Sequence, residues 1–331
     1  MNDTDIVICY NKAERINPME DMLQVPVLFI LYNRLEPAKQ AFAQIRKVRP
    51  QKLYIACDGS KKDKPGDWEK VEAVRQWILS AIDWKCQVNT RFAEENQGCK
   101  YGPVNAINWV FEKEEEAIIL EDDIVAEESF FMYCQTMLEM YRNDTRIMLV
   151  SGNKAVWDYP IEEDYFFTAY TQIWGWATWR RAWNFYDIEA KQWLYYKSIH
   201  LLDDVYGKNT AICYTENIDR IYSGNLDAWD YLWTLAVAAN SGLGILPKYN
   251  LIQNVGYGED STHTTGKAPD FHINPMVFPI KPVDHVARNW EYDRVHGKKY
   301  VNPRKFHRFV RRFIPKPILK KWYRFRGVKS V

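Results

Sequence analysis

The sequence predicts an α/β protein with a mainly parallel sheet flanked by helices. Short apolar runs alternate with longer segments in which apolar residues recur at helical spacing. This alternation is typical of β-α-β units, in which crossover helices join parallel strands. Polar residues directly follow three of the apolar runs. Because open α/β sheets bind ligands beyond the carboxyl ends of their strands, these residues predict a ligand cleft along that edge.

Three strands are expected in the N-terminal part of the chain, over 25–31, 53–57 and 87–92. The first two are continuous apolar runs, as strands buried on both faces usually are. A helix beginning at Pro37, a residue favoured in the first helical turn, is expected between them. Residues 67–83 have apolar side chains at helical spacing and are expected to form the next helix.

The middle of the chain continues this alternation. A polar loop over 94–102 is expected to lead into a helix that begins near Pro103. The next expected elements are a strand over 117–123, a helix over 127–142 and a strand over 147–150.

The chain from 157 to 235 is dense in aromatic residues. The whole sequence contains 14 Trp and 21 Tyr among 331 residues, which fits a large core as well as a surface that binds sugars or nucleobases. Farther on, a pair of short strands is expected around 242–255, and residues 256–266 are expected to form a mobile loop.

The composition is that of a globular protein, with 47% hydrophobic and 26% charged residues. The six cysteines are scattered and form no CxxC pair, which predicts reduced thiols. The N-terminus does not resemble a signal peptide, and we find no apolar window long enough for a membrane-spanning helix. We therefore expect a cytoplasmic protein.

The charge is unevenly distributed along the chain. Residues 1–297 carry 31 basic and 43 acidic residues, whereas 298–331 carry 13 basic residues and no acidic one. In this tail, Phe306, Phe309 and Phe313 recur at helical spacing among Arg and Lys. Basic amphipathic helices with aromatic residues are typical of membrane surfaces. We expect the tail to bind an anionic membrane surface, with nucleic acid as the less favoured alternative.

Glu121, Asp122 and Asp123 form an acidic triplet at the end of the strand expected over 117–123. Adjacent carboxylates repel one another, and burial strengthens the repulsion unless a cation is present. Hard divalent cations bind carboxylate oxygens together with substrate phosphates. The triplet therefore indicates a Mn²⁺ or Mg²⁺ site for a phosphorylated ligand, and an acidic loop is the alternative.

Polar residues near other strand ends are candidates for the same cleft. Asn33 and Arg34 follow the first strand, and an arginine can bind a carboxylate or phosphate with two parallel hydrogen bonds. Asp58 follows the second strand and is either a helix cap or a contact to a base or ribose. Lys100 lies between Gly98 and Gly102 in a loop of the phosphate-binding type, although it matches no established phosphate-loop motif and a surface lysine is the alternative.

Two acids and one histidine in the C-terminal half complete the candidates. Asp227 and Asp230 precede an expected helix, so each is either a helix cap or a general base that takes a proton from a substrate hydroxyl. His263 lies among Ser and Thr residues and is either solvent-exposed or close to a metal-bound diphosphate.

The order of these motifs resembles that of GT-A glycosyltransferases, whose fold is Rossmann-like. The motifs are Asn33-Arg34, Asp58-Gly59-Ser60, Asn96-x-Gly98 and Leu120-Glu121-Asp122-Asp123. Residues 118–131 resemble the N-acetylglucosaminyltransferase I type. Residues 173–179, 229–233 and 254–264 are similar to a bacterial group of nucleotide-diphospho-sugar transferases, often called HlpA-like. The resemblance covers roughly residues 25–265.

The resemblance implies that the acidic triplet binds the donor and its metal. Asp123 would bind Mn²⁺ or Mg²⁺ at the donor diphosphate, and His263 is a further candidate ligand. Asp122 would lie against the donor ribose, and Glu121 beside the sugar or a metal-bound water.

The resemblance also implies roles for the other candidates. Asp58 would face the nucleobase, and Asp230, which follows Trp229 as a Trp precedes the base of the family, would be the catalytic base. Asp227 is the second choice for that base. The remaining donor-binding candidates are Asn33, Arg34 and Lys100.

The function implied is that of a metal-dependent inverting glycosyltransferase acting in bacterial surface-glycan synthesis. The donor would be a nucleotide-diphosphate sugar, with a UDP-sugar favoured, and the acceptor a hydroxyl of a glycan or a lipid-linked molecule. The expected organisation is a leader (1–24), a nucleotide-sugar-binding half (25–153), an acceptor and catalytic half (154–297) and the basic tail (298–331). The tail would hold the protein at the inner face of the cytoplasmic membrane.

Two other functions remain open at this stage. A sugar-phosphate nucleotidyltransferase would share the nucleotide-binding architecture, but its N-terminal glycine-rich signature is not found in the sequence. A non-catalytic carbohydrate-binding protein would explain the aromatic residues but not the carboxylates at the end of a strand.

Overall fold

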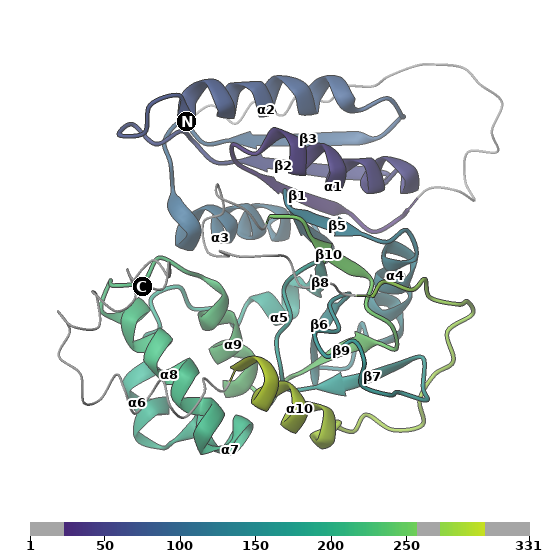
Figure 1. The fold of residues 1–331 in the computed structure, drawn as a ribbon, viewed down its shortest axis with the longest axis vertical. Helices are drawn as coiled ribbons and strands as arrows, with labels where there is room; N and C mark the ends of the chain where they lie inside the picture. The colour runs from purple at the N-terminus through teal and green to yellow at the C-terminus, as the bar shows by residue number, and fades with distance from the viewer. Residues whose placement is uncertain (1–22, 257–271, 302–331) are drawn as a thin grey trace, which may run out of the picture.

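A computed structural model describes residues 23–256 and 272–301 of the chain. Its centre is an eight-stranded sheet in the order β3-β2-β1-β4-β8-β6-β9-β7 (Figure 1). Four strands from the N-terminal half are mutually parallel, namely β1 (Val27–Leu31), β2 (Lys52–Cys57), β3 (Gln87–Phe92) and β4 (Glu116–Glu121). They bring the strand ends predicted to carry polar residues to one edge of the sheet.

The other four strands extend the sheet with mixed directions. They are β6 (Ile147–Ser151), β7 (Tyr165–Thr168), β8 (Trp176–Trp179) and β9 (Leu243–Pro247). β8 runs antiparallel to both β4 and β6, β9 runs parallel to β6, and β7 runs antiparallel to β9. Parallel pairings are therefore in the majority, which confirms the predicted α/β class with a mainly parallel sheet.

Helices cover both faces of the sheet. Alternate residues of β1 and β4, such as Val27, Phe29 and Leu120, pack against α1 (Leu35–Val48), α2 (Asp67–Ala81) and α4 (Ser129–Met140). The intervening residues, such as Leu28 and Ile119, belong to a second core that includes α3 (Gly98–Phe111), α5 (Arg180–Trp183) and α9 (Asp230–Ala239). Burial on both faces explains why these strands read as continuous apolar runs.

A helical group lies at one side of the sheet, apart from α1 and α2 (Figure 1). It consists of α6 (Trp193–Ser198), α7 (Leu201–Tyr206) and α8 (Lys208–Tyr222), and it packs on α9 through a separate aromatic-rich core. The last described elements are α10 (Trp290–His296) and a short π-helix (Gly297–Val301). Among the described residues, no helix is long and apolar enough to cross a membrane.

Two predicted elements are corrected by the structure. The helix expected to begin near Pro103 is α3, which begins at Gly98, because carboxylates distant in sequence accept hydrogen bonds from its first backbone N–H groups. The strands expected around 242–255 exist, but they do not pair with each other. β9 lies in the main sheet, whereas β10 (Ile252–Asn254) pairs with β5 (Ile124–Ala126) in a two-stranded sheet.

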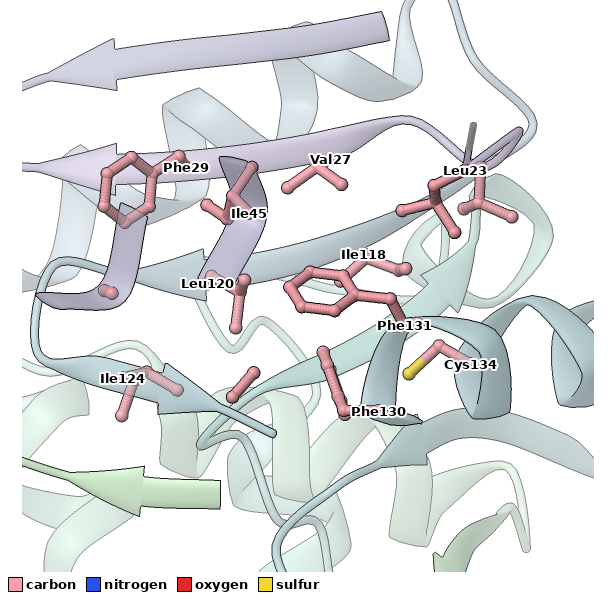
Figure 2. Close-up of a cluster of buried hydrophobic side chains, with 14 of the residues drawn as sticks. Leu23, Val27, Phe29, Ile45, Ile118, Leu120, Ile124, Phe130, Phe131 and Cys134 are labelled. Atoms are coloured by element: carbon pink, nitrogen blue, oxygen red, sulfur yellow. The ribbon is translucent and has the colours of Figure 1, made fainter. Parts of the chain in front are cut away.

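The core between β1, β4 and α4 supplies a test of this packing. Figure 2 shows Phe29 of β1 and Leu120 of β4 in the same buried cluster as Phe130 and Phe131 of α4. Phe29 is fully buried and stacks on Phe42 of α1, with 6.0 Å between ring centroids.

We expect Phe29→Ala to lower the free energy of unfolding by about 3–5 kcal/mol, because it leaves a cavity that the surrounding side chains cannot fill. Urea unfolding measures this loss. Phe185→Ala is the control, since Phe185 is 55% exposed, and it should change stability by less than about 0.5 kcal/mol. Equal losses in the two variants would contradict the packing described.

Candidate active site

A cavity of about 240 Å³ opens at the carboxyl ends of β1, β2 and β4. Five residues singled out in the sequence line it, namely Arg34, Asp58, Glu121, Asp122 and Asp123. Its wall also includes Asn96, Asn105 and Cys99. The cavity therefore lies where ligands bind in open α/β sheets.

Arg34 links the two aspartates of the acidic triplet. Its Nη1 donates a hydrogen bond to Asp123 Oδ2 at 2.9 Å, and its Nη2 makes an ion pair with Asp122 Oδ1. Arg34 occupies the N-cap of α1 without making a capping bond, although Ser, Thr, Asp and Asn are preferred there. The Arg34 side chain therefore stabilises the two carboxylates and does not cap the helix.

The acidic triplet brings several carboxylates together in a buried environment. Asp122 and Asp123 are only 3% and 8% exposed. Burial raises the pKa of Glu121, and the charges of Asp123 and Asp122 raise it further. Burial also raises the pKa of Asp122, although Arg34 opposes this effect. One arginine faces three acids, so the site favours a further cation.

The residues present suit a hard divalent cation shared with a ligand. Within residues 23–256 and 272–301, no group of three or more His, Cys, Asp or Glu side chains could hold a metal by itself. Mg²⁺, however, is commonly held by one or two carboxylates together with substrate phosphates. Asp122 and Asp123 supply two such carboxylates, so they fit a metal that arrives with a diphosphate.

The backbone after β10 approaches the triplet closely. Val255 N donates to the carbonyl oxygen of Asp123 at 2.9 Å, and Asn254 Oδ1 accepts from Gly256 N at 2.8 Å. A Cβ atom on Gly256 would lie 2.0 Å from Asp123 Oδ2, so only glycine fits. Sequence reasoning assigned these residues no role, and pairing of β10 with β5 is what brings them to the site.

Asp58 organises the loop before α3. Its carboxylate accepts hydrogen bonds from Gly59 N and Gln97 N, both at 2.8 Å, and from Asn96 Nδ2 at 2.9 Å. Burial raises its pKa, and the hydrogen bonds from the backbone oppose this effect. Asp58 thus fixes one wall of the cavity, and its predicted contact with a nucleobase stays a prediction.

Asn33 and Lys100 do not line the cavity. Asn33 Nδ2 donates to Asp67 Oδ1 at 2.6 Å, at the start of α2. Lys100 lies in the first turn of α3, with its Nζ 5.3 Å from the centre of the Tyr101 ring. Their predicted donor-binding roles stay predictions.

The two candidate bases lie in different environments. Asp227 accepts hydrogen bonds from Cys99 N and Lys100 N, at 2.9 and 2.8 Å. Asp230 is the first residue of α9, and its charge is one of those that raise the pKa of Glu121, after burial and the other two acids. His263 lies outside the described residues.

The aromatic run is mostly core. Trp176, Trp179 and Trp183 are buried, and Trp176 stacks on Trp229 with 5.8 Å between centroids. Trp174 differs, because it is only partly buried and lines the cavity. Its exposure to the cavity could not be recognised from the number of aromatic residues in the sequence.

Comparisons with known proteins give distant likenesses only. No protein-family model and no curated protein matches the sequence. Among solved structures, residues 1–349 of S. aureus TarS match 69% of this chain at 11% identity, with a TM-score of 0.39. GalNAc-T7 with UDP, GalNAc and Mn²⁺ also matches 69%, at 10% identity and a TM-score of 0.40. The chain spans 59% and 43% of these two chains, respectively.

Asp67 provides a test of the structure beside the cavity. Tyr32 OH, Lys61 N and Asn33 Nδ2 all donate to its buried carboxylate. Burial alone would raise the pKa of Asp67, but these hydrogen bonds outweigh it and lower the pKa to about 2.

We expect Asp67→Asn to lower the free energy of unfolding at pH 7 by about 2 kcal/mol, because hydrogen bonds to a charged group are lost. A depressed pKa stabilises the fold above the unfolded value near 4, and this contribution disappears as the pH falls towards 2. The difference between wild type and variant in urea unfolding should therefore shrink between pH 4 and pH 2. Asp63→Asn, at an exposed position, is the control. A difference that is independent of pH would contradict the assignment.

Proposed function

We propose that this protein is a GT-A glycosyltransferase that uses a nucleotide-diphosphate sugar, preferably a UDP-sugar, and Mn²⁺ or Mg²⁺. The observation that carries the proposal is the buried Asp122–Asp123 pair at the end of β4, which faces Arg34 inside a cavity of about 240 Å³. Carboxylates beside an arginine suit a diphosphate and its metal, since the arginine binds phosphate oxygens and the acids bind the cation. The finer assignment to the N-acetylglucosaminyltransferase I or HlpA-like type stays a prediction from the sequence.

The proposed donor extends from the nucleobase end of the cavity to the acidic triplet. The loop that Asp58 holds, with Asn96 and Asn105, offers amide groups for a nucleobase and ribose. Arg34 would bind the diphosphate, and Asp123 would hold the metal. Asp122, which the resemblance places against the ribose, is proposed here as a second carboxylate for the metal, because Arg34 pairs with both aspartates. When bound, the metal would offset negative charge on the departing diphosphate.

Asp230 is the proposed general base. An acceptor hydroxyl would lose its proton to the Asp230 carboxylate while its oxygen forms a bond to the anomeric carbon. The bond from that carbon to the diphosphate oxygen breaks, and the nucleoside diphosphate leaves with the electron pair. Attack from the opposite face inverts the anomeric centre, and this single displacement requires one base and no enzyme nucleophile.

The first test is release of UDP from a panel of UDP-glucose, UDP-galactose and UDP-N-acetylglucosamine with Mn²⁺. We expect Asp230→Asn to lower kcat at least about a hundredfold, because a general base is lost. Asp123→Ala should abolish the dependence on Mn²⁺ along with most activity. Asp83→Asn, at an exposed ion pair with Arg46, is the control and should leave kcat unchanged. Undiminished activity in Asp123→Ala would contradict the proposal.

The basic tail supports a separate proposal, that the protein binds the cytoplasmic membrane surface where lipid-linked or envelope glycans are made. Residues 302–331 lie outside the described part of the chain, so this proposal rests on their sequence. Each basic residue near an anionic leaflet contributes about 1 kcal/mol to binding.

We expect the full chain to float with vesicles containing phosphatidylglycerol but not with vesicles of phosphatidylcholine alone. A chain ending at residue 301 should float with neither, since most of the basic residues of the tail are absent. Equal flotation of the two chains with anionic vesicles would refute the membrane role of the tail.

A further inference from the structure

Asp227 joins two distant parts of the molecule. Its Oδ2 accepts from Cys99 N at 2.9 Å and its Oδ1 from Lys100 N at 2.8 Å. These N–H groups belong to the first turn of α3, which has no partner for them within the helix. Asp227 itself lies in the segment 223–229 that connects α8 to α9. A carboxylate from the C-terminal half thus caps a helix of the N-terminal half.

The capped turn is also part of the cavity wall. Gly98 and Cys99 both line the cavity, and Gly98 N donates to Asp58 Oδ2 at 3.2 Å. The start of α3 is therefore held by two carboxylates, Asp58, which follows β2, and Asp227 from the α8–α9 segment. The turn that Asp227 holds therefore forms part of one wall of the cavity.

Gly98 has the geometry that this contact requires. Its φ angle is +76°, which favours glycine. A Cβ atom at this position would also lie 2.6 Å from Asp227 Oδ2, so a side chain there would push the carboxylate away. Both features explain why a glycine is present where the helix begins.

The α8–α9 segment, which contains Asp227, ends directly before the proposed base, Asp230. Trp229 is 5% exposed and packs against Trp176 and Trp183, so it anchors the chain just before α9. Asp230 follows as the first residue of that helix. The start of α9 is thus fixed on one side by the aromatic core and on the other by the bond of Asp227 to α3.

We infer that Asp227 is a positioning residue, which aligns Asp230 with the donor cavity by tethering the α8–α9 segment to α3. The inference rests on the proposed role of Asp230 as the base. Asp227 is the second-choice base from the sequence, and the backbone N–H groups bound to both of its carboxylate oxygens favour the positioning role. Its side chain is exposed to solvent, so the contact can open and close without unfolding the core.

Two measurements on the full chain test this inference. The first is hydrogen exchange of the Cys99 and Lys100 amides, which requires no nucleotide. We expect Asp227→Ala to speed their exchange at least about tenfold, and Asp227→Asn, which keeps one acceptor oxygen, to have a smaller effect. Unchanged exchange in Asp227→Ala would overturn the contact itself.

The second measurement separates positioning from binding. We expect Asp227→Ala to lower kcat for UDP release about tenfold or more, while the Kd for UDP with Mn²⁺, from calorimetry, changes less than about threefold. Asp227→Asn should recover part of kcat. An unchanged kcat, or a Kd that weakens as much as kcat falls, would overturn the positioning role.

Asp187→Ala is the matched control. Its carboxylate also accepts from two backbone N–H groups, those of Glu189 and Lys191, but neither of these residues lines the cavity, whereas Cys99 does. We expect it to leave kcat, Kd and the exchange of Cys99 and Lys100 unchanged. If wild-type protein binds no UDP, the proposed function fails, whereas the exchange measurement still decides whether Asp227 tethers the two parts.

Discussion

The ion pairs between Arg34 and the buried carboxylates of Asp122 and Asp123 are the interaction on which the site depends. Two adjacent buried aspartates repel each other, and burial strengthens the repulsion unless a cation lies beside them. Arg34 supplies one positive charge from the N-cap of α1. Burial lowers the pKa of Arg34, but the charges of the two aspartates outweigh this effect and raise it. Glu121 remains beside this pair, and the charge left over is what makes the cavity suited to a further cation.

The sheet fixes where this charge lies. β4 is buried on both faces, and its side chains alternate between the core beside α4 and the core beside α3. Between its first residue, Glu116, and its last, Glu121, the strand is fully buried and has no room for carboxylates. Parallel pairing with β1 then places the triplet beside Arg34. The second half of the molecule closes the same site from outside, through Gly256 against Asp123 and through Asp227 on α3.

Local sequence patterns predicted the structural features that depend on residues close together in the chain. The apolar runs predicted the parallel strands, and the acids after β4 predicted a charged cleft that Arg34 and Asp58 also line. What the sequence could not reveal depends on contacts between distant residues. The start of α3 at Gly98 requires Asp227, which lies 128 residues beyond Cys99, and the separate partners of β9 and β10 follow from the sheet order. The contact of Asn33 with Asp67 is another that the sequence did not reveal, and its predicted contact with the donor stays a prediction.

In the proposed function, the metal and the diphosphate depend on each other for binding, since Arg34 already neutralises part of the carboxylate charge and the described residues contain no metal cage of three or more ligands. Binding of Mn²⁺ to the wild-type protein, followed by electron paramagnetic resonance with and without UDP, tests this most directly. We expect saturating UDP to tighten Mn²⁺ binding at least about tenfold, because the phosphates would supply further ligands to the metal. Mn²⁺ binding of equal strength with and without UDP would contradict it.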